Sequence, residues 1–298
     1  MSDQITRSNF SSVEQAMQSA GFSPEKVKQE ISFAIQIINK SPQLQKCSKE
    51  SLQVAVLNIS NIGLSLNPAS KEAYLIPRWN SAAKQNEACL EPSYVGLVKL
   101  LTDAGSVTSV LCQLVHEGDV FEVDLANNIS PVIHKPELNR SKRGDIMVVY
   151  ALATLPDKSR QVEYMGLEEI NEIRERSETY KAYKEGKIKS CTWVSDFGEM
   201  ARKTVIKRGS KYLPRTDRMH FIDEAIKHDN TDFAASDNQL AYIDSLLHTS
   251  LLDERQRAAI EMELSVMNGQ RATEVIKLLK SNQQLDDRET LRKIQQRV

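Results

Sequence analysis

The stretch WVSDFGEMARKTVIKRGSKYLPRTDR, from Trp193 to Arg218, is the most informative part of this chain. Residues 187–218 carry nine Lys and Arg against three acids, a local charge of +6 in a protein whose net charge is -1. On a helical wheel, an arc of about 140° collects four cations and apolar residues fill the adjoining arc; the cations are Lys203, Lys207, Arg208 and Lys211. Solvated helix faces usually intersperse acids. We therefore favour a polyanion site over a plain solvated face.

The bulk composition describes a soluble globular chain. Of the 298 residues, 27% are charged and 40% are hydrophobic, which is typical of one large or two ordinary domains. No apolar stretch approaches the 18 or so residues that cross a bilayer, and the first residues lack the apolar core of a signal peptide. The four cysteines show no C-x-x-C spacing, so we expect neither a zinc site nor disulfides and place the protein in a reducing cytoplasm.

The N-terminal third predicts three helices. The first spans residues 11–20, and the second begins at Ser23-Pro24, where Ser suits the N-cap and Pro the first helical position. A third runs from about residue 48 to Gly63, a plausible C-cap.

The middle third changes to a strand period. We expect strands at residues 73–77 and 87–90, joined by a polar loop over residues 79–86, and then a helix at residues 94–104. Further β-rich segments follow at residues 107–115, 120–125, 144–155 and 161–165, with Pro156–Ser159 as a hairpin turn. A helix at residues 167–176 and a polar stretch at residues 177–190 precede the basic segment.

The chain divides into two predicted units. Residues 1–228 form the first, with N-terminal helices at 11–63 and an α+β core at 70–215. The polar residues 229–237 are the linker, and residues 238–298 form a small helical module. From Asp229 to Val298 there are 12 acids and 9 bases, so this module as a whole is a poor match for DNA.

The sequence motifs of several enzyme classes are absent from this chain. There is no G-x-x-x-x-G-K-[ST] loop for a nucleoside triphosphate, and no G-x-S-x-G or H-E-x-x-H motif. The five His residues are scattered, and the acid pairs at Glu168 and Asp286 stand at predicted helix starts, where acids favour the helix dipole. We therefore expect no catalytic residue, no metal site and no ATP, with Mg²⁺ at most a counterion of DNA.

Aromatic residues lie next to cations. Trp193 opens the basic segment, Trp79 follows Arg78, and Tyr94 and Lys99 share the helix that comes next. Such pairs suit a groove that follows phosphates and stacks bases. The alternative is that both Trp residues belong to the core.

Four motifs resemble one known family. They are L-N-P-x-S-x-x-A-Y-L-I-P-R at residues 66–78, Y-x-G-L at 94–97, H-E-G-D-x-F at 116–121, and W-x(6)-M-A-R-K-T-x-I-K-R-x-x-K-Y-L-P at 193–214. The series is similar to the RecT family of phage and mobile-element single-strand annealing proteins, within the RecT/Redβ superfamily. The resemblance covers about residues 27–213.

The resemblance implies an α+β fold, in which a small bent antiparallel sheet flanked by helices forms a DNA groove and an all-helical C-terminal module follows. It also implies an ATP-independent, non-enzymatic recombinase that binds single-stranded DNA, pairs it with a complementary strand and holds the duplex. Such proteins form homo-oligomeric rings or helical filaments and would act in the cytoplasm of a bacterial host.

Twelve residues are the candidate DNA contacts. Those of the basic segment are Lys189, Trp193, Arg202, Lys203, Lys207, Arg208, Lys211 and Arg215, and those before it are Arg78, Trp79, Tyr94 and Lys99. Arg202 falls on the packing side of the wheel, so a structural ion pair is an alternative for it. Trp79 departs from what several relatives carry.

The C-terminal module is expected to bind a partner. Its basic end suits an acidic peptide, either of a cognate 5′-3′ exonuclease or of the host single-strand-binding protein, and the candidate residues are Lys277, Lys280, Arg292 and Lys293. A solvated helix surface is the alternative there. For the whole chain, a Mg²⁺-dependent DNA nuclease and a non-catalytic adaptor for an acidic protein remain open.

Overall fold

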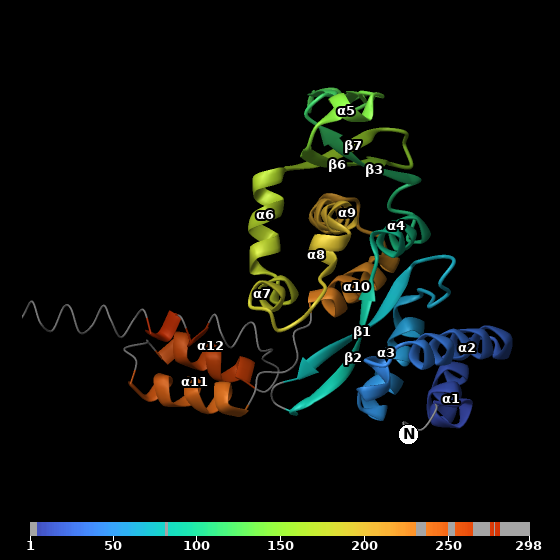
Figure 1. The fold of residues 1–298 in the computed structure, drawn as a ribbon, viewed down its shortest axis with the longest axis vertical. Helices are drawn as coiled ribbons and strands as arrows, with labels where there is room; N and C mark the ends of the chain where they lie inside the picture. The colour runs from blue at the N-terminus through green and yellow to red at the C-terminus, as the bar shows by residue number, and fades with distance from the viewer. Residues whose placement is uncertain are drawn as a thin grey trace, which may run out of the picture.

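A computed structural model describes residues 5–80, 83–230, 237–249, 254–264, 275–276 and 278–280. The α+β fold class is confirmed, with the antiparallel strands divided among three small sheets. Figure 1 shows the main body as a stack of layers along its long axis, from the N-terminal helices through a two-stranded sheet and a helical layer to a three-stranded sheet.

The three N-terminal helices are confirmed. They are α1 (Ser11–Ser19), α2 (Pro24–Lys40) and α3 (Lys49–Ile62). The hydroxyl of Ser23 caps α2 by accepting the N–H of Lys26 at 3.3 Å. Gly63 ends α3 in the left-handed conformation, with φ of 73°, which glycine adopts without a steric cost.

The first hairpin is longer than expected. Strands β1 (Ala73–Asn80) and β2 (Gln85–Pro92) pair along their whole length, with Trp79 opposite Asn86. The expected polar loop over residues 79–86 is therefore wrong at both ends. Polar side chains misled the prediction because the tip of a hairpin is held by cross-strand backbone bonds and needs no apolar face.

Helix α4 (Tyr94–Asp103) begins where the chain leaves β2. The hydroxyl of Ser93 accepts the N–H of Gly96 at 3.1 Å and donates to the carbonyl of Lys71 at 2.6 Å. A Cβ atom on Gly96 would lie 2.2 Å from the carbonyl oxygen of Glu72. Glycine is thus required for α4 to pack this closely on the chain before β1.

The strands of the middle third form two further sheets. In the first, β6 (Ile146–Thr154) lies between β3 (Ser109–His116) and β7 (Arg160–Gly166). In the second, β4 (Val120–Val123) pairs with β5 (Val132–Lys135), a strand that the sequence did not predict. The expected hairpin turn at Pro156–Ser159 is confirmed, because Leu155 donates to the carbonyl of Ser159 at 2.8 Å. The short helix α5 (Arg140–Arg143) precedes β6.

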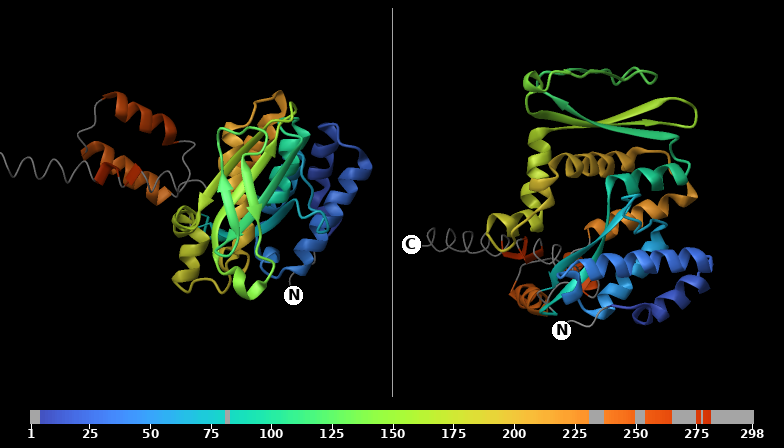
Figure 2. Two further views of the ribbon diagram at one scale, coloured as in Figure 1. Left: turned by 90° about the horizontal axis from the view of Figure 1, so that it is seen from above. Right: turned by 45° about the vertical axis from the view of Figure 1, so that its right-hand side comes forward.

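A second set of helices follows the three-stranded sheet in the chain. They are α6 (Leu167–Arg176), α7 (Glu178–Lys184), α8 (Thr192–Ser195), α9 (Phe197–Gly209) and α10 (His220–Asn230). Helices α6 and α9 contact the sheet, whereas α10 packs against β2, α3 and α4. The sheet lies across α9 in the views of Figures 1 and 2. Helix α7 falls in the polar stretch at residues 177–190, for which the sequence predicted no helix or strand, and α10 carries helical structure past the expected linker start at residue 229.

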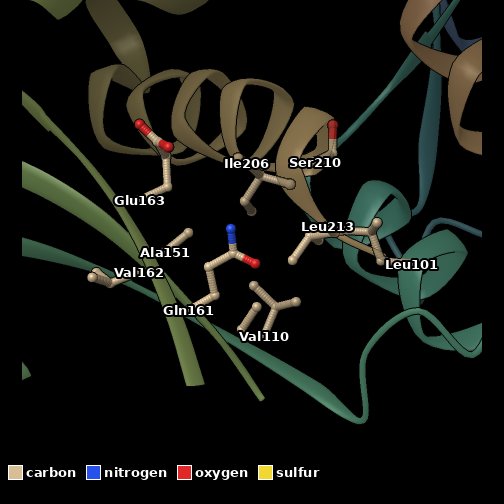
Figure 3. A pocket seen from close by; sticks show the side chains of 11 residues that line it. Leu101, Val110, Ala151, Gln161, Val162, Glu163, Ile206, Ser210 and Leu213 are labelled. Carbon is tan, nitrogen blue, oxygen red and sulfur yellow. The ribbon is translucent and has the colours of Figure 1, made fainter. Parts of the chain in front are cut away.

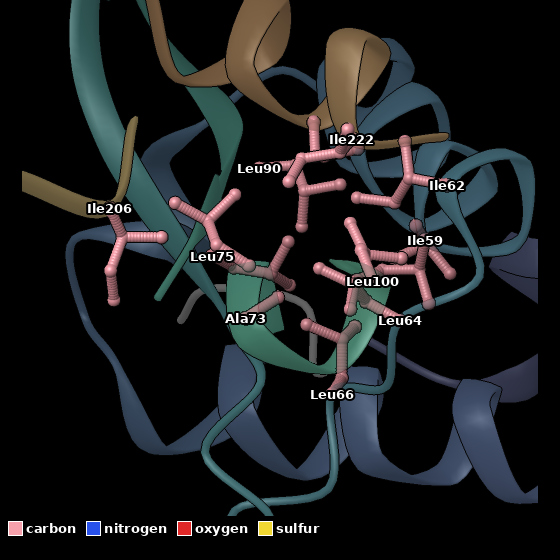
Figure 4. Packing of buried hydrophobic residues seen from close by; sticks show 14 of the residues in the cluster. Ile59, Ile62, Leu64, Leu66, Ala73, Leu75, Leu90, Leu100, Ile206 and Ile222 are labelled. Atoms are coloured by element: carbon pink, nitrogen blue, oxygen red, sulfur yellow. The ribbon is translucent and has the colours of Figure 1, made fainter. Parts of the chain in front are cut away.

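One apolar core joins these layers. It combines Ile59 of α3, Leu75 of β1 and Leu90 of β2 with Leu100 of α4 and Ile222 of α10, as Figure 4 shows. Fully burying side chains of this size stabilises the fold by about 1.5–3 kcal/mol each. The core therefore fixes the positions of the strands and helices that carry the candidate site.

The described part of the C-terminal region is helical. Helix α11 (Asp237–Thr249) and helix α12 (Glu254–Glu263) pack with Val275 and Leu279 around a separate small core that includes Ile243 and Ile260. Residues 231–236 of the expected linker and residues 281–298 of the expected helical module lie outside the described residues. None of the helices in the described ranges has both the length and the apolar character that crossing a bilayer requires.

Candidate nucleic-acid interface

A cleft of about 830 Å³ opens on one side of the main body. Its walls are parts of β1 and β2, the end of α6, the segment 187–195, one face of α9 and the last turn of α10. Six bases and three acids line it: Arg78, Arg176, Lys187, Lys189, Lys203 and Lys207 against Glu91, Glu178 and Asp229. The excess of positive charge suits a polyanion such as a nucleic-acid backbone.

Ion pairs hold the floor of the cleft. The ammonium nitrogen of Lys203 lies 2.9 Å from Oε1 of Glu91 and also contacts the carboxylate of Asp229. The other oxygens of the two acids contact Arg78 at 3.2 Å and Lys207 at 2.6 Å. We call Arg78, Glu91, Lys203, Lys207 and Asp229 the charged network. It ties β1, β2, α9 and α10 together.

Burial and charge oppose each other in this network. Burial by itself lowers the pKa of Lys203, but Asp229 and Glu91 outweigh it and hold that pKa above its ordinary value. Burial likewise raises the pKa of Asp229, and the two lysines overcome this and hold it below its ordinary value. Both groups are therefore charged near neutral pH.

Three bases at the rim of the cleft are exposed: Arg176, Lys187 and Lys189. Lys187 lies 2.5 Å from Glu185, and no ion pair of Lys189 is found among the described residues. Beneath them Trp193 is only 4% exposed, its ring 6.2 Å from that of Phe197. The rim cations are thus available to a ligand, whereas Trp193 supports the wall as a core residue.

Five of the twelve candidate DNA contacts meet in this cleft: Arg78, Lys189, Trp193, Lys203 and Lys207. The other seven line other parts of the described surface. Tyr94, Lys99 and Arg202 gather around α4, where the guanidinium of Arg202 lies 5.9 Å from the Tyr94 ring and 2.6 Å from Glu199. Lys99 pairs with Asp103 at 2.5 Å.

The remaining four candidates are Arg208, Lys211 and Arg215, which follow Lys207 in the chain, and Trp79, near the tip of the β1–β2 hairpin. Arg208 pairs with Glu163 at 2.5 Å and Glu169 at 2.8 Å, and Arg215 pairs with Asp223. Trp79 is 60% exposed, so the core alternative does not hold for it. Lys211 is exposed as well.

Two features of the helical wheel are corrected. Lys203 is 5% exposed, although the wheel places it on the free cationic face. The error arises because β2 and α10 cover that face and supply the acids that neutralise Lys203. Helix α9 also ends at Gly209, and Lys211 lies on a 3₁₀ turn at Ser210–Tyr212 rather than on the same helix.

Neither acid of the charged network is among the candidates that the sequence predicts, and the rim cations Arg176 and Lys187 are not among them either. Glu91 did give a signal, since a single acid within the strand run Ala88–Pro92 is rarely buried unless it is paired. Asp229 gave none, because its lysine partners are 22 and 26 positions earlier in the chain. The polar residues around it favoured a linker.

Other parts of the described structure offer little chemistry. A cavity of about 20 Å³ between α9 and the three-stranded sheet is lined by Val110, Ile206 and Leu213 (Figure 3) and has room for about one water molecule. Burial raises the pKa of the Cys112 thiol to about 12. In the described ranges no group of three or more His, Cys, Asp or Glu could hold a metal ion.

Comparison with known proteins agrees with the motifs. The model of the RecT family matches residues 28–240, a range that contains every element of the cleft. The chain belongs to the RecT family. It is 33% identical over 186 residues to Protein RecT of Escherichia coli (strain K12). That alignment covers 62% of this chain and 65% of the relative, so the chain spans about two thirds of the RecT protein that it matches.

The RecT family match stops at residue 240, so most of the C-terminal region lies beyond it. Of the four partner-binding candidates, Lys280 is described: it is exposed, with its ammonium nitrogen 5.1 Å from the centre of the Tyr242 ring. Lys277, Arg292 and Lys293 lie outside the described residues.

Proposed function

We propose that this protein is a single-strand annealing protein of the RecT family, which binds single-stranded DNA, pairs it with a complementary strand and holds the annealed duplex without ATP. The observation that carries the proposal is the cleft, which gathers six Lys and Arg side chains from four separate parts of the chain. Membership of the RecT family supports it.

The cleft suits binding that ignores sequence. Lys and Arg contact phosphates, which carry no sequence information, so any strand can be held. The bases of the held strand then stay free for Watson–Crick pairing with an incoming strand, which does the recognition. No residue of the protein needs to make or break a covalent bond.

We also propose that the protein assembles with copies of itself, binds a partner protein and acts in a bacterial cytoplasm. Side-by-side copies of the chain, joined by a heterologous contact, would form a ring or helical filament along the DNA. The C-terminal module would bind an exonuclease or the single-strand-binding protein of a bacterial host. The protein would act on DNA in the cytoplasm of that host. Mg²⁺ would serve at most as a counterion.

The binding test removes two exposed rim cations. Arg176→Ala with Lys189→Ala should weaken binding of a labelled oligonucleotide and make the salt dependence shallower by about 1.4 in log–log slope, since each phosphate contact to single strands contributes about 0.7. Lys26→Ala with Lys28→Ala, on exposed positions of α2 outside the cleft, is the matched control. Equal losses in both double variants would sink the assignment to this cleft.

The annealing test uses two complementary oligonucleotides, one fluorescent and one with a quencher. Wild type should speed their pairing in EDTA without ATP, and the rim double variant should not. Strand lengths on a denaturing gel after incubation with Mg²⁺ should be unchanged. Shortened strands would favour the nuclease alternative, and a requirement for ATP would refute that part of the proposal.

A further inference from the structure

Asp229 occupies an unusual place in the cleft. It lies in the last turn of α10, with a side chain only 8% exposed. One carboxylate oxygen is 2.6 Å from the ammonium nitrogen of Lys207, and the other contacts that of Lys203. Two of the cations that face the cleft therefore share one acid, which comes from an element at its edge.

A phosphate group would satisfy the same two lysines. A phosphodiester, like a carboxylate, carries one negative charge and offers two oxygen atoms that accept charge-assisted hydrogen bonds. The charged network has three bases and two acids, and exchanging the Asp229 carboxylate for a phosphate leaves its total charge unchanged. Nε of Arg78 is also buried and has no hydrogen-bond partner within the described residues, so the same wall holds an unused donor.

We propose that Asp229 is an internal substitute for a DNA phosphate, which occupies Lys203 and Lys207 in the free protein and is displaced when single-stranded DNA enters the cleft. The inference rests on the proposed function, since it assigns a regulator to that same site. Competition of this kind lowers the apparent affinity by the fraction of molecules in which the lysines are free.

The displacement has a consequence for the C-terminal region. The last turn of α10 is anchored to α9 through Asp229, and the chain continues from it toward α11. DNA that releases Asp229 would therefore loosen this turn. DNA binding in the cleft would thus affect the C-terminal module, because the loosened turn of α10 is covalently joined to it.

The first experiment compares two isosteric changes on α10. Asp229→Asn removes the internal competitor, whereas Glu224→Gln removes an equal charge from an exposed position that pairs with Lys227 at 3.6 Å. A labelled oligo(dT) is titrated at several salt concentrations, with circular dichroism as the check on folding. Asp229→Asn should bind at least about threefold more tightly, with a slope steeper by about 0.7 for each lysine freed, and Glu224→Gln should match wild type. Weaker or unchanged binding by Asp229→Asn, or equal tightening in both variants, overturns the inference.

A second measurement uses the wild-type protein and so does not depend on how the variant folds. Hydrogen–deuterium exchange at the amides of residues 226–230 should become faster when oligo(dT) is added. Slower or unchanged exchange there contradicts displacement. If wild type does not bind oligo(dT) at all, the proposed function fails and takes this inference with it. If the Arg176 and Lys189 substitutions weaken binding but Asp229→Asn does not tighten it, only the inference about Asp229 fails.

Discussion

The ammonium group of Lys203 illustrates the physics of this site at the scale of one residue. Lys203 is only 5% exposed, and it remains charged because it pairs with the carboxylates of Glu91 and Asp229. Removing one member of such a group leaves uncompensated charge in a poorly solvated place. Stability and ligand binding are therefore coupled in this part of the cleft.

Lys203→Ala is expected to lower the free energy of unfolding by about 3 kcal/mol, because Glu91 and Asp229 would lose a shared partner. Urea unfolding followed by tryptophan fluorescence measures this. Lys211→Ala is the control: this lysine is exposed, and its loss should change stability by less than about 0.5 kcal/mol. Equal stability of the two variants would contradict the role of the charged network.

Asp119 gives a second prediction for a single residue. Its buried carboxylate accepts the backbone N–H groups of His116 at 3.0 Å and Glu137 at 2.8 Å, and it contacts His134 at 3.1 Å and Arg143 at 3.3 Å. Burial opposes ionisation, but these partners outweigh it and hold the pKa of Asp119 well below its usual range.

A depressed pKa stabilises the fold above the ordinary carboxyl value of about 3.9, and this contribution is lost as the pH falls below it. Asp119→Asn should therefore lower the free energy of unfolding by about 2 kcal/mol or more at pH 7. The difference in this free energy from wild type should shrink below about pH 4. Urea unfolding at a series of pH values measures both. A difference that stays constant down to pH 2 would show that Asp119 does not act through its charge.

At the scale of elements, α4 meets the chain just before β1 at one glycine. A Cβ on Gly96 would approach the carbonyl oxygen of Glu72 to 2.2 Å and Leu64 to 3.1 Å. Backbone cannot move aside as a flexible side chain can, so the helix would have to shift. This contact limits how closely α4 can pack on the chain before β1.

Gly96→Ala should therefore destabilise the protein by about 1–3 kcal/mol. Gly166→Ala is a suitable control, because nothing lies within 4 Å of a Cβ atom there, and it should cost less than about 1 kcal/mol. Thermal unfolding by circular dichroism compares the two. An unaffected Gly96→Ala variant would mean that the helix and the chain before β1 do not approach as closely as described.

At the scale of the whole molecule, the described residues form two apolar clusters, one in the main body and one around Ile243 and Ile260. We propose that the two clusters divide the work, so that residues 1–228 anneal DNA and residues 238–298 bind a partner.

Deleting the residues after Asp237 should leave annealing of oligonucleotides in vitro at wild-type rates and reduce recombination in cells. The quenching assay and a marker-rescue assay measure the two effects. The matched control is full-length protein with Lys280→Ala, which removes one exposed charge of the module. Loss of annealing by the truncated protein in vitro would refute the division.

The sequence by itself determined the elements whose signals are local. Caps such as Ser23 and Gly63, the turn at Pro156–Ser159 and the basic segment after Trp193 all depend on neighbouring residues, and each was predictable. Only the tertiary structure decided which cations are free. Lys203 needed Glu91, 112 positions away, and Asp229, 26 positions away, to become an interior residue, and no helical wheel contains those partners. The physical reason is that burial and charge pairing are long-range properties of the packed chain, whereas helix starts, helix ends and turns are set by a few adjacent residues.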